Sequence, residues 1–462
     1  LAEGPMAYPA GRDAWRSTVR RSLRRLAAMH SDVVRTTPRG LRPPMPRLHH
    51  LRSVVVAAMA AVLLVPPTTP SAQAAVTTPY ARTFQTNLAP GISYERGTMW
   101  TSRERRQAVH IARVQPWRAN VRLKTVLSDD RVVGKLVVRR MVDERRRVGF
   151  RPMVAVNGDM ATRGRDDAYA APHSMAVSNR ELLVAFECVK PILGIDADGT
   201  ARIANVRQHI TLTLPGEAEP RRVDRLNTHR DDDAVVLFTQ RFADSTQTAP
   251  GGVEVILGLQ GRVRANGTQT VRVRRVTHGA GDTRIPRGMA VLSVNDPEDA
   301  WVYGLVKGQD LILQTRVVKR VDKSCGGRVK AADGWGNIVE AQGGNRRTVK
   351  DGTVRVPSPE EYPSGWERHP RTGLGLTADG EVLMVVVDGR RKGSRGVSLA
   401  EMGELMVSLG AEQAFNLDGG GSSVIARFDK RTKKFIVANK PSDGRQRPAT
   451  QGFAAFHVKP RS

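Results

Sequence analysis

The chain has few of the residues that build several common kinds of site. Its 462 residues include two cysteines, Cys188 and Cys325, and ten scattered histidines, which give no metal-finger spacing. Phe, Trp and Tyr make up only 5% of the sequence, so few aromatic platforms stand near the basic residues to stack on nucleic-acid bases. The hydrophobic run at 54–65 has 12 residues, whereas a membrane-spanning helix needs about 20. These features argue against zinc-finger, nucleic-acid-binding and membrane-spanning proteins.

Acidic residues are also in short supply, since 45 Asp and Glu face 73 Lys and Arg and the formal net charge is +28. Beyond residue 75 the balance is still 62 basic against 42 acidic residues. The two kinds are interleaved rather than gathered into one basic stripe, which favours a solvated charged surface over a nucleic-acid partner. Attraction to anionic cell-wall polymers is the second interpretation of this charge.

The N-terminal region predicts export. Arg47 and Arg52 precede the hydrophobic run, Pro66 and Pro67 end it, and the small-residue stretch SAQAA closes at Ala75. This order of a basic, an apolar and a small-residue segment is typical of a secretory signal peptide, here 45–75, and is less compatible with a buried core helix. We therefore expect a secreted, extracellular protein that begins near Val76, and we interpret 1–44 as an over-extended gene start or a disordered segment.

The length of the chain allows two or three domains, or one elaborate domain with insertions. We divide it into an N-terminal part of a catalytic domain (76–189), a β-rich middle region (190–320) and a C-terminal part of the catalytic domain (321–462). Strand-like alternation at 91–127 is followed by helical spacing at 132–147. In an oxidising compartment the two cysteines could form one disulfide, although their spacing does not show that they meet.

Residues 370–458 have the clearest local patterns. Asp379-Gly380 between two apolar runs predicts a hairpin with a type I′ turn. Ser398 and Glu401 form a capping box that opens a helix, and Gly410 lies where a left-handed cap would end it. Together these patterns predict an α+β fold, with a β-rich mixed sheet and helices packed on it.

Three polar turns follow apolar strands. They are Asn157-Gly158-Asp159, Asp388-Gly389-Arg390, and the stretch 416–423 with its three consecutive glycines. Rigid strands can aim such polar groups, and glycine lets a ligand approach the backbone. The glycine amides could form a nest for an oxyanion, or the stretch could be an ordinary flexible turn. It is not a P-loop, because GK[ST] is absent.

The segments around these turns resemble the phosphodiester glycosidase family. FNLDGGGSS (415–423) carries the resemblance together with HPRTGLGLTADGEVLMVVVDGR (369–390), SLAEMGELMVSLGAEQA (398–414) and NKPSDGRQRP (439–448). AVNGDM (155–160) and EAQGGNRRTVKDG (340–352) fall at the family's NG-containing strand end and Gly-Gly segment, so the resemblance spans roughly 90–458. It departs from the family at Met160, usually aromatic, and at Asn345, usually small.

The resemblance implies a phosphodiester-glycosidase-like fold and hydrolysis of a sugar-1-phosphodiester bond, as in N-acetylglucosamine-1-phosphodiester cleavage. Glycosidases commonly use two carboxylates. Asp418 is the first candidate to act at the anomeric centre or on water, and Asp388 is the second, with a hairpin-end turn residue as its alternative. Asp159 is a second acid or a metal ligand, and Glu340 is a weaker carboxylate candidate.

The remaining candidates bind substrate. Asn157 and Asn416 would hold sugar hydroxyls or an N-acetyl group, and Arg371 and Arg390 would hold the phosphate. Backbone and hydroxyl donors for the phosphate would come from Gly420, Gly421 and Ser422. A divalent cation is compatible with the three aspartates, although their spacing specifies no known metal site.

Other chemistries are weaker fits. Ser422 is not in a G-x-S-x-G elbow and has no histidine in a matching context, so a serine hydrolase is disfavoured. We expect His173 and His369 to be structural or exposed. A non-catalytic carbohydrate- or cell-wall-binding protein on the same fold remains an alternative, as does a phosphodiesterase that releases sugar phosphate.

Overall fold

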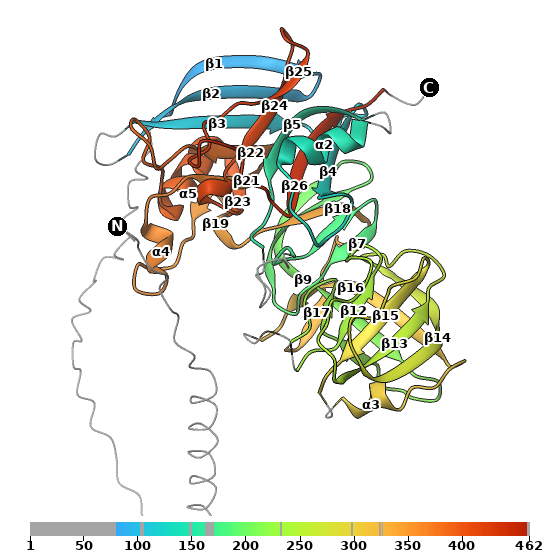
Figure 1. Cartoon of the computed structure of the whole chain (residues 1–462). Helices are drawn as coiled ribbons and strands as arrows, with labels where there is room; N and C mark the ends of the chain where they lie inside the picture. Colours follow the sequence, from blue (N-terminus) through green and yellow to red (C-terminus); the bar gives the residue numbers. More distant parts are fainter. Residues whose placement is uncertain are drawn as a thin grey trace, which may run out of the picture. The chain divides into compact units, whose positions relative to one another are not determined.

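The computed structural model describes residues 80–101, 106–146, 150–161, 171–231, 233–296, 299–322, 325 and 327–459. These residues belong to one compact unit of the chain. The predicted over-extended start (1–44) and signal peptide (45–75) lie outside the described residues. Strands dominate the unit, as Figure 1 shows, and the predicted β-rich architecture is confirmed.

The first sheet has eight antiparallel strands. In spatial order they are β1 (Tyr80–Ala89), β2 (Ile92–Trp100), β3 (Arg106–Val114), β22 (Val382–Val387), β21 (Arg371–Thr377), β23 (Ala411–Asn416), β19 (Arg346–Lys350) and β20 (Thr353–Val354). Of the first three strands along the chain, β3 pairs directly with β22 from the C-terminal third, and the two lie side by side in Figure 1.

The second sheet has five antiparallel strands. In order they are β25 (Lys434–Val437), β24 (Ile425–Asp429), β5 (Arg151–Asn157), β26 (Gln451–His457) and β4 (Val121–Leu127). Buried side chains of both sheets belong to one hydrophobic cluster, for example Val386 and Phe415 from the first and Val156 and Phe453 from the second. The main core therefore lies between these two sheets.

The third sheet has thirteen strands and one parallel pair, β11 with β12. Its path is β11 (Arg225–Leu226), β12 (Val236–Thr239), β15 (Met289–Val294), β13 (Gly252–Gly258), β14 (Gly267–Ala280), β16 (Asp310–Arg320), β9 (Ala201–Thr213), β8 (Lys190–Asp196), β18 (Ile338–Gly343), β6 (Ala176–Ser178) and β7 (Glu181–Val184), with β10 (Arg221–Val223) on β9 and β17 (Val329–Ala331) on β16. This sheet crosses both boundaries of the predicted middle region, 190–320.

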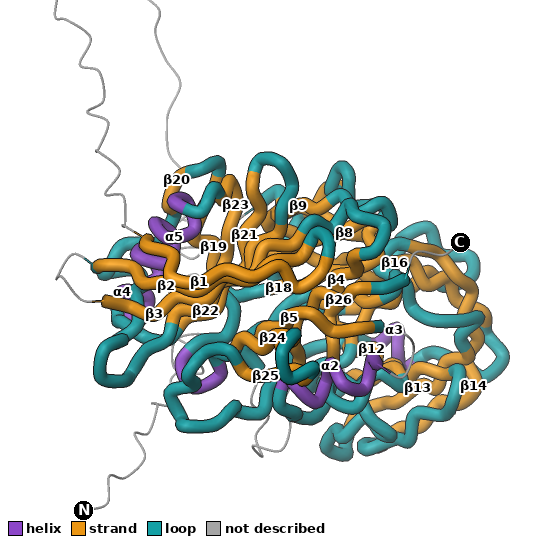
Figure 2. The backbone as a smooth tube through the Cα atoms, turned by 90° about the horizontal axis from the view of Figure 1, so that it is seen from above, coloured by secondary structure: helices purple, strands orange, loops and turns teal. Residues whose placement is uncertain are grey.

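Helices form a small part of the described chain, as the tube in Figure 2 shows. They are α2 (Val138–Arg146), α3 (Ala300–Tyr303), α4 (Pro363–Trp366), α5 (Leu399–Ser408) and a single 3₁₀ turn, η1 (Gly420–Ser422). The helix predicted over 132–147 starts later, at Val138. Before that point the backbone N–H groups of Val132 and Val133 donate to the carbonyls of Arg241 and Phe242 in the middle region. These bonds hold the segment non-helical until α2 starts.

The helix α5 forms as its local sequence predicts. The Ser398 side chain accepts the Glu401 N–H and the Glu401 side chain accepts the Ser398 N–H, so the capping box is confirmed. Met402 and Met406 lie on its buried face and reach Gly373 of β21, where an added Cβ would come within 2.8 Å of each terminal methyl carbon. Gly410 has a φ of +92°, which confirms the left-handed cap.

The hairpin between β21 and β22 is confirmed, but its turn is not type I′. That type needs positive φ at both central residues, and here Gly380 has φ +86° while Asp379 is not left-handed. The longer loop, closed by the Thr377 N–H donating to the Glu381 carbonyl, needs only one left-handed residue. The continuous apolar run of β22 has a simple cause, because Val386 packs into the main core and Val385 into the cluster beneath α5.

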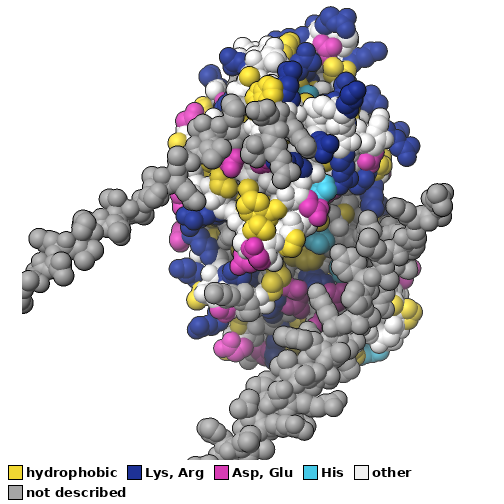
Figure 3. Space-filling view, turned by 90° about the vertical axis from the view of Figure 1, so that its left-hand side faces the viewer, with side chains coloured by type: hydrophobic (Ala, Val, Ile, Leu, Met, Phe, Trp, Pro, Cys, Tyr) yellow, Lys and Arg dark blue, Asp and Glu magenta, His cyan; other side chains and the backbone are white. Residues whose placement is uncertain are grey.

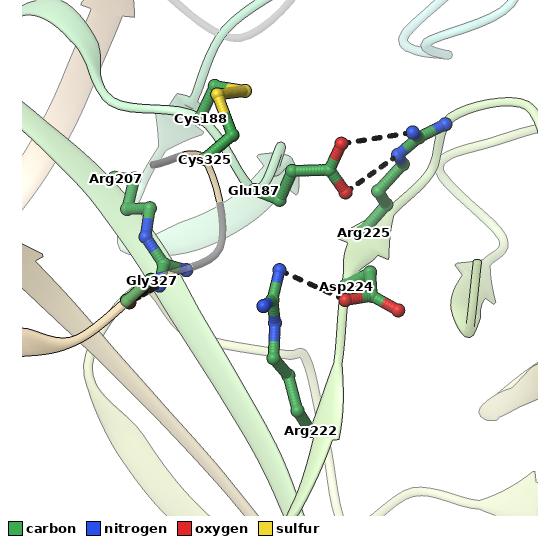
Figure 4. Close-up of a disulfide and its surroundings, with 8 residues drawn as sticks. All are labelled: Glu187, Cys188, Arg207, Arg222, Asp224, Arg225, Cys325 and Gly327. Carbon is green, nitrogen blue, oxygen red and sulfur yellow. Dashed lines mark hydrogen bonds and ion pairs between the residues drawn. A yellow bond between two sulfur atoms is a disulfide. The ribbon is translucent and has the colours of Figure 1, made fainter. Parts of the chain in front are cut away.

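The two cysteines do pair. Cys188 and Cys325 form a disulfide with a Cα–Cα distance of 4.6 Å, across 137 residues of sequence. Figure 4 shows it above a group of ion pairs in which Glu187 binds Arg225 and Arg222 binds Asp224. The disulfide therefore joins the segment between β7 and β8 to the segment that leads into β17.

Candidate active site

The candidate site forms where a strand of each smaller sheet ends. β5 ends in Asn157-Gly158-Asp159, and β23 ends at Asn416, after which the chain crosses from the first sheet to the second and enters β24. Asp418 lies in this crossing and its N–H donates to the Gly158 carbonyl at 3.1 Å. The fold therefore brings together two turns that are about 260 residues apart in the chain.

Asn157 fastens the two turns to each other. Its Nδ2 donates to the Asp418 carbonyl at 2.8 Å, and its Oδ1 accepts the Thr372 hydroxyl at 2.8 Å and the Val424 N–H at 3.1 Å. The residue is completely buried. Its side chain is thus occupied by protein groups, so the structure gives Asn157 a positioning role and leaves direct sugar binding by this residue without support.

Asp418 carries the first of two neighbouring carboxylates. Its Oδ1 accepts the Gly419 N–H at 2.9 Å, and Ser422 bonds to its side chain. Burial raises the pKa of this carboxyl, against the lowering effect of these bonds and of the Arg447 charge. A buried carboxylate with few donors is a strong base or nucleophile when ionised.

Asp159 carries the second carboxylate and is almost fully buried. Its Oδ2 accepts the Ser174 hydroxyl at 2.6 Å and its Oδ1 accepts the Met160 N–H at 2.8 Å. Burial raises the pKa of this carboxyl to about 6; Ser174, Met160 and Lys190 lower it, and the charge of Asp418 raises it further. The charge of Asp418 is therefore close enough to disfavour ionisation of Asp159.

The Gly-Gly segment at the end of β18 makes room for this arrangement. A Cβ added at Gly343 would come within 2.0 Å of the Ser174 Oγ, the hydroxyl that holds Asp159. A Cβ at Gly344 would come within 2.4 Å of the Phe415 ring and 2.7 Å of the Asn416 carbonyl oxygen. The close approach of backbone and side chains, rather than an unusual φ, explains both glycines.

Asp388, the second-ranked catalytic candidate, has a different environment. Its carboxylate accepts hydrogen bonds from Arg391 at 2.8 Å and Asn439 at 3.1 Å, and His110 lies 3.6 Å away with its other ring nitrogen bonded to the Tyr94 hydroxyl. Burial would raise its pKa, but the bonds from His110, Asn439 and Arg391 outweigh this effect and hold the pKa below its usual value. Asp388 is thus an ionised, fully bonded group that ties β22 to the segment at 439–440.

Replacing Asp388 by Ala should destabilise the protein by about 3 kcal/mol, because Arg391, Asn439 and His110 lose their common acceptor in a buried place. Chemical denaturation would measure the free energy of unfolding, with Asp379→Ala, an exposed aspartate at the other end of the same hairpin, changing it by less than about 0.5 kcal/mol. Unchanged stability together with lost activity would instead make Asp388 a catalytic group.

Two of the amides of the triple-glycine turn, those of Gly420 and Ser422, are bonded within the fold. The Gly420 N–H donates to the Pro370 carbonyl at 2.8 Å and the Ser422 N–H to the Gly419 carbonyl at 3.2 Å, within the 3₁₀ turn η1. These amides are therefore not turned toward a ligand, and the Ser422 side chain serves Asp418. Gly421 is packed closely too, since an added Cβ would come within 2.2 Å of Arg447 Nη2.

Two guanidinium groups lie against this turn. Arg390 Nη2 would be 3.2 Å from a Cβ at Gly420, and the same nitrogen lies 3.2 Å from His369 Nδ1. Arg390 is exposed, and no carboxylate within the described part of the chain forms an ion pair with it. Arg447 is held by Asp443 at 2.7 Å. Arg390 thus offers a guanidinium group without a carboxylate partner next to the turn that follows Asp418, as an anion-binding residue needs.

Arg371 and Asn416 face the other side of the first sheet. Arg371 is buried and donates to the carbonyls of Val397 at 3.1 Å and Glu367 at 2.9 Å, on the side of α4 and α5. Asn416 pairs directly with Gly373, whose missing Cβ points at α5. Thr372 lies between Arg371 and Gly373, so its side chain points to the opposite face of the strand, where its hydroxyl donates to Asn157. Within the described residues neither side chain bonds to the aspartate pair, although Arg371 Cδ would be 3.8 Å from a Cβ at Gly419, the residue after Asp418.

The other sequence candidates take structural places. Glu340 is buried and bonds to Lys124 at 2.8 Å and to the Asn179 N–H at 2.9 Å. The backbone N–H of His173 donates to the Met160 carbonyl, and burial lowers the pKa of its ring, with Lys190 adding to the effect. The two departures from the family pattern touch each other, since Asn345 Nδ2 lies 3.2 Å from Met160 Sδ.

Within the described ranges, no three His, Cys, Asp or Glu side chains are grouped so that they could hold a metal ion. The divalent cation that the sequence leaves open therefore gains no set of ligands from Asp159, Asp388 and Asp418. Cavities of about 250 and 530 Å³ adjoin near Glu181 and Arg241 in the third sheet, away from the aspartate pair.

The basic residues do not gather into one stripe on the face seen in Figure 3, where Lys and Arg side chains are spread over the surface with Asp and Glu among them. This distribution agrees with a solvated charged surface on that face. None of the helices in the described part of the chain has the length and hydrophobicity that crossing a membrane would require.

Sequence reasoning missed several residues of the site. Asn439 and Arg447 lie inside the NKPSDGRQRP segment, whose resemblance to the family does not reveal the roles of its single side chains. His110 is a polar residue between the buried Val109 and Ile111 of β3, which is a usable signal for a buried polar network. Ser174 and Lys190 gave no local signal, because only the packing of β18 and β8 brings them to Asp159.

Comparison with known proteins agrees with the resemblance in the sequence. Residues 254–456 match the model of the phosphodiester glycosidase family, so the predicted resemblance is confirmed. The matched segment contains Asp388 and Asp418, and Asp159 lies before it. The SPbeta prophage-derived uncharacterized protein YomE of Bacillus subtilis is 36% identical over 99 residues, which are 21% of this chain and 14% of that protein.

Two solved structures share the fold. A hypothetical protein from Synechocystis has a TM-score of 0.64 at 14% identity, covering 82% of this chain and 64% of its own. A protein from Burkholderia pseudomallei has a TM-score of 0.63 at 17% identity, covering 82% and 98%. The catalytic domain of zebrafish N-acetylglucosamine-1-phosphodiester alpha-N-acetylglucosaminidase is less similar, with a TM-score of 0.40 at 12% identity over 85% and 92%.

Proposed function

We propose that this chain is a secreted glycosidase that hydrolyses the bond between C1 of a sugar and the phosphate of a sugar-1-phosphodiester, in cell-wall or other extracellular polysaccharide. The observation that supports the proposal most directly is the pair of buried aspartates, Asp159 and Asp418, each with a raised pKa, where β5 and β23 end. The family match of residues 254–456 supports the same reaction class. Export rests on the signal-like sequence at 45–75.

In this reaction the C1–O bond breaks, the water oxygen ends on C1, and the phosphate leaves as a monoester. Asp418 is the group that we assign to C1 or to the attacking water. Asp159 is the proton donor, and its pKa of about 6 matches the second pKa of a phosphate monoester, about 6. Arg390 stabilises the charge that develops on the leaving phosphate.

Product analysis tests the proposal. The purified full chain would be incubated with UDP-GlcNAc and with a methyl phosphodiester of GlcNAc, with and without EDTA, and the products separated by chromatography. We expect free GlcNAc together with UDP or methyl phosphate. GlcNAc-1-phosphate as the product would identify a phosphodiesterase. A folded protein that binds wall polymer and yields neither product would be a binding protein on this fold.

A further inference from the structure

The side chain of Gln451, the first residue of β26, is buried without hydrogen-bond partners. It has no exposed surface, and neither its Oε1 nor its Nε2 meets a partner within the described part of the chain. Its backbone is conventionally bonded, with the carbonyl accepting the Gly158 N–H at 2.9 Å. Because a buried amide without partners is unfavourable, such a group calls for a reason.

The position of Gln451 supplies that reason. A Cβ added at Gly158 would come within 2.4 Å of Gln451 Cγ, so the glutamine covers the backbone that Asp159 follows directly. The Gly158 carbonyl in turn accepts the Asp418 N–H. Gln451 therefore lies against Gly158, which precedes Asp159 in the chain and accepts the hydrogen bond from Asp418.

The register of β26 places the glutamine beside the end of β5, since Gly452, the next residue, lies opposite Asn157. Gln451 lies opposite Leu127, and Phe453, two residues on, lies opposite Thr125. The Thr125 hydroxyl donates to the Ala341 carbonyl of β18 at 2.8 Å, and Lys124 bonds to Glu340 of the same strand, so β18 lies along the edge strand β4 of the second sheet. β18 ends at Gly343, which packs against the Ser174 hydroxyl that holds Asp159. β18 thus links the edge of the second sheet, to which β26 belongs, with the residue that holds Asp159.

The chemistry of a primary amide limits the ligand. It presents one acceptor and two donor hydrogens in one plane, so its best partner is a neutral group that both donates and accepts. An ionised phosphate accepts only and would leave Oε1 without a partner. Sugar hydroxyls and an acetamido group meet the requirement.

We propose that Gln451 binds a hydroxyl or acetamido group of the sugar and so orients the ring between Asp159 and Asp418. This assignment rests on the proposed glycosidase function. It adds the first residue of β26 to a site whose other members end β5 and follow β23.

The first measurement is the melting temperature of Gln451→Met, which keeps the side-chain length and removes both polar atoms. Without ligand we expect the melting temperature to rise by about 1–2 °C, because an unpartnered amide is lost from the interior. The matched control is Gln107→Met, an equally buried glutamine whose Oε1 accepts the Gly396 N–H at 2.8 Å, and its melting temperature should fall. A fall for Gln451→Met would overturn the proposal, since the amide would then already be satisfied in the fold.

The second measurement is sugar recognition. Gln451→Met should raise the KM for UDP-GlcNAc and UDP-glucose about tenfold with a smaller change in kcat if a hydroxyl common to both is bound, and for UDP-GlcNAc alone if the acetamido group is bound. An unchanged KM on both substrates would overturn the proposal.

If the wild type releases no sugar from either substrate, the glycosidase assignment fails and Gln451 is judged by binding alone. N-acetylglucosamine and glucose at millimolar concentration should then raise the melting temperature of the wild type and not that of Gln451→Met. No shift of the wild type with either sugar would overturn the proposal.

Discussion

Replacing Asp418 by Asn should reduce the release of free sugar by about 10³-fold while the protein stays folded. The asparagine Oδ1 can still accept the Gly419 N–H, which Asp418 now accepts at 2.9 Å, so the turn keeps its local bond. What is lost is the negative charge next to C1, and burial makes that charge effective because little water screens it. Initial rates on UDP-GlcNAc, with a melting curve for each protein, would measure the effect.

The same position can separate the two roles open to Asp418. Asp418→Ala leaves space on the face of the sugar that the carboxylate occupied, and sodium azide can enter it. If Asp418 is the nucleophile, azide should restore cleavage and form a glycosyl azide whose anomeric configuration is opposite to that of the substrate. If Asp418 activates water, azide should restore little. If Asp418→Asn cleaves the substrate as fast as the wild type without azide, Asp418 has no role in the mechanism.

Replacing Asp159 by Asn should reduce kcat/KM about 10²-fold at pH 5 and change the shape of the pH profile. With a pKa of about 6, Asp159 is protonated below that pH, so a proton-donating role predicts that wild-type kcat/KM falls as the pH rises through about 6. The variant cannot donate, so this limb should disappear from its profile. A wild-type rate that rises through pH 6 would make Asp159 a base instead.

Stability gives an independent check on the same pKa. Since the folded protein raises the pKa of Asp159 from 3.8 to about 6, the folded state binds the proton more tightly than the unfolded chain does. The contribution of this residue to stability is therefore fully present below about pH 4 and is lost as the pH rises through 6. We expect Asp159→Asn to melt higher than the wild type at pH 8, and the difference to close toward pH 4.

The phosphate explains why the effect at Asp159 should be the smaller one. A phosphate monoester is already a good leaving group, and Arg390, with no ion-pair partner in the described ranges, can stabilise it as a dianion. The charge at Asp418 has no such substitute. The order of the two effects is therefore part of the prediction, and the reverse order would point to proton donation as the harder step.

The sequence by itself determined the local elements and the polar turns. Ser398 and Glu401 specify the start of α5, Gly410 specifies its end, and the apolar runs of β21 and β22 specify the hairpin, because these signals act over a few residues. The same local logic picked out Asp159 and Asp418, since both follow strands. It mistook the turn type at Asp379-Gly380 and the start of α2, where bonds to the middle region intervene.

Only the tertiary structure decided which polar groups meet. Asp388 follows its strand just as Asp159 does, yet His110, Arg391 and Asn439 surround it with partners and hold it ionised. Arg371 and Asn416 have the right chemistry but point to the helix side of the sheet, because side chains alternate along a strand and the packing of α5 selects the face. The disulfide, the Ser174 contact with Asp159 and the burial of Gln451 depend on pairings between strands far apart in the chain, which no local pattern encodes.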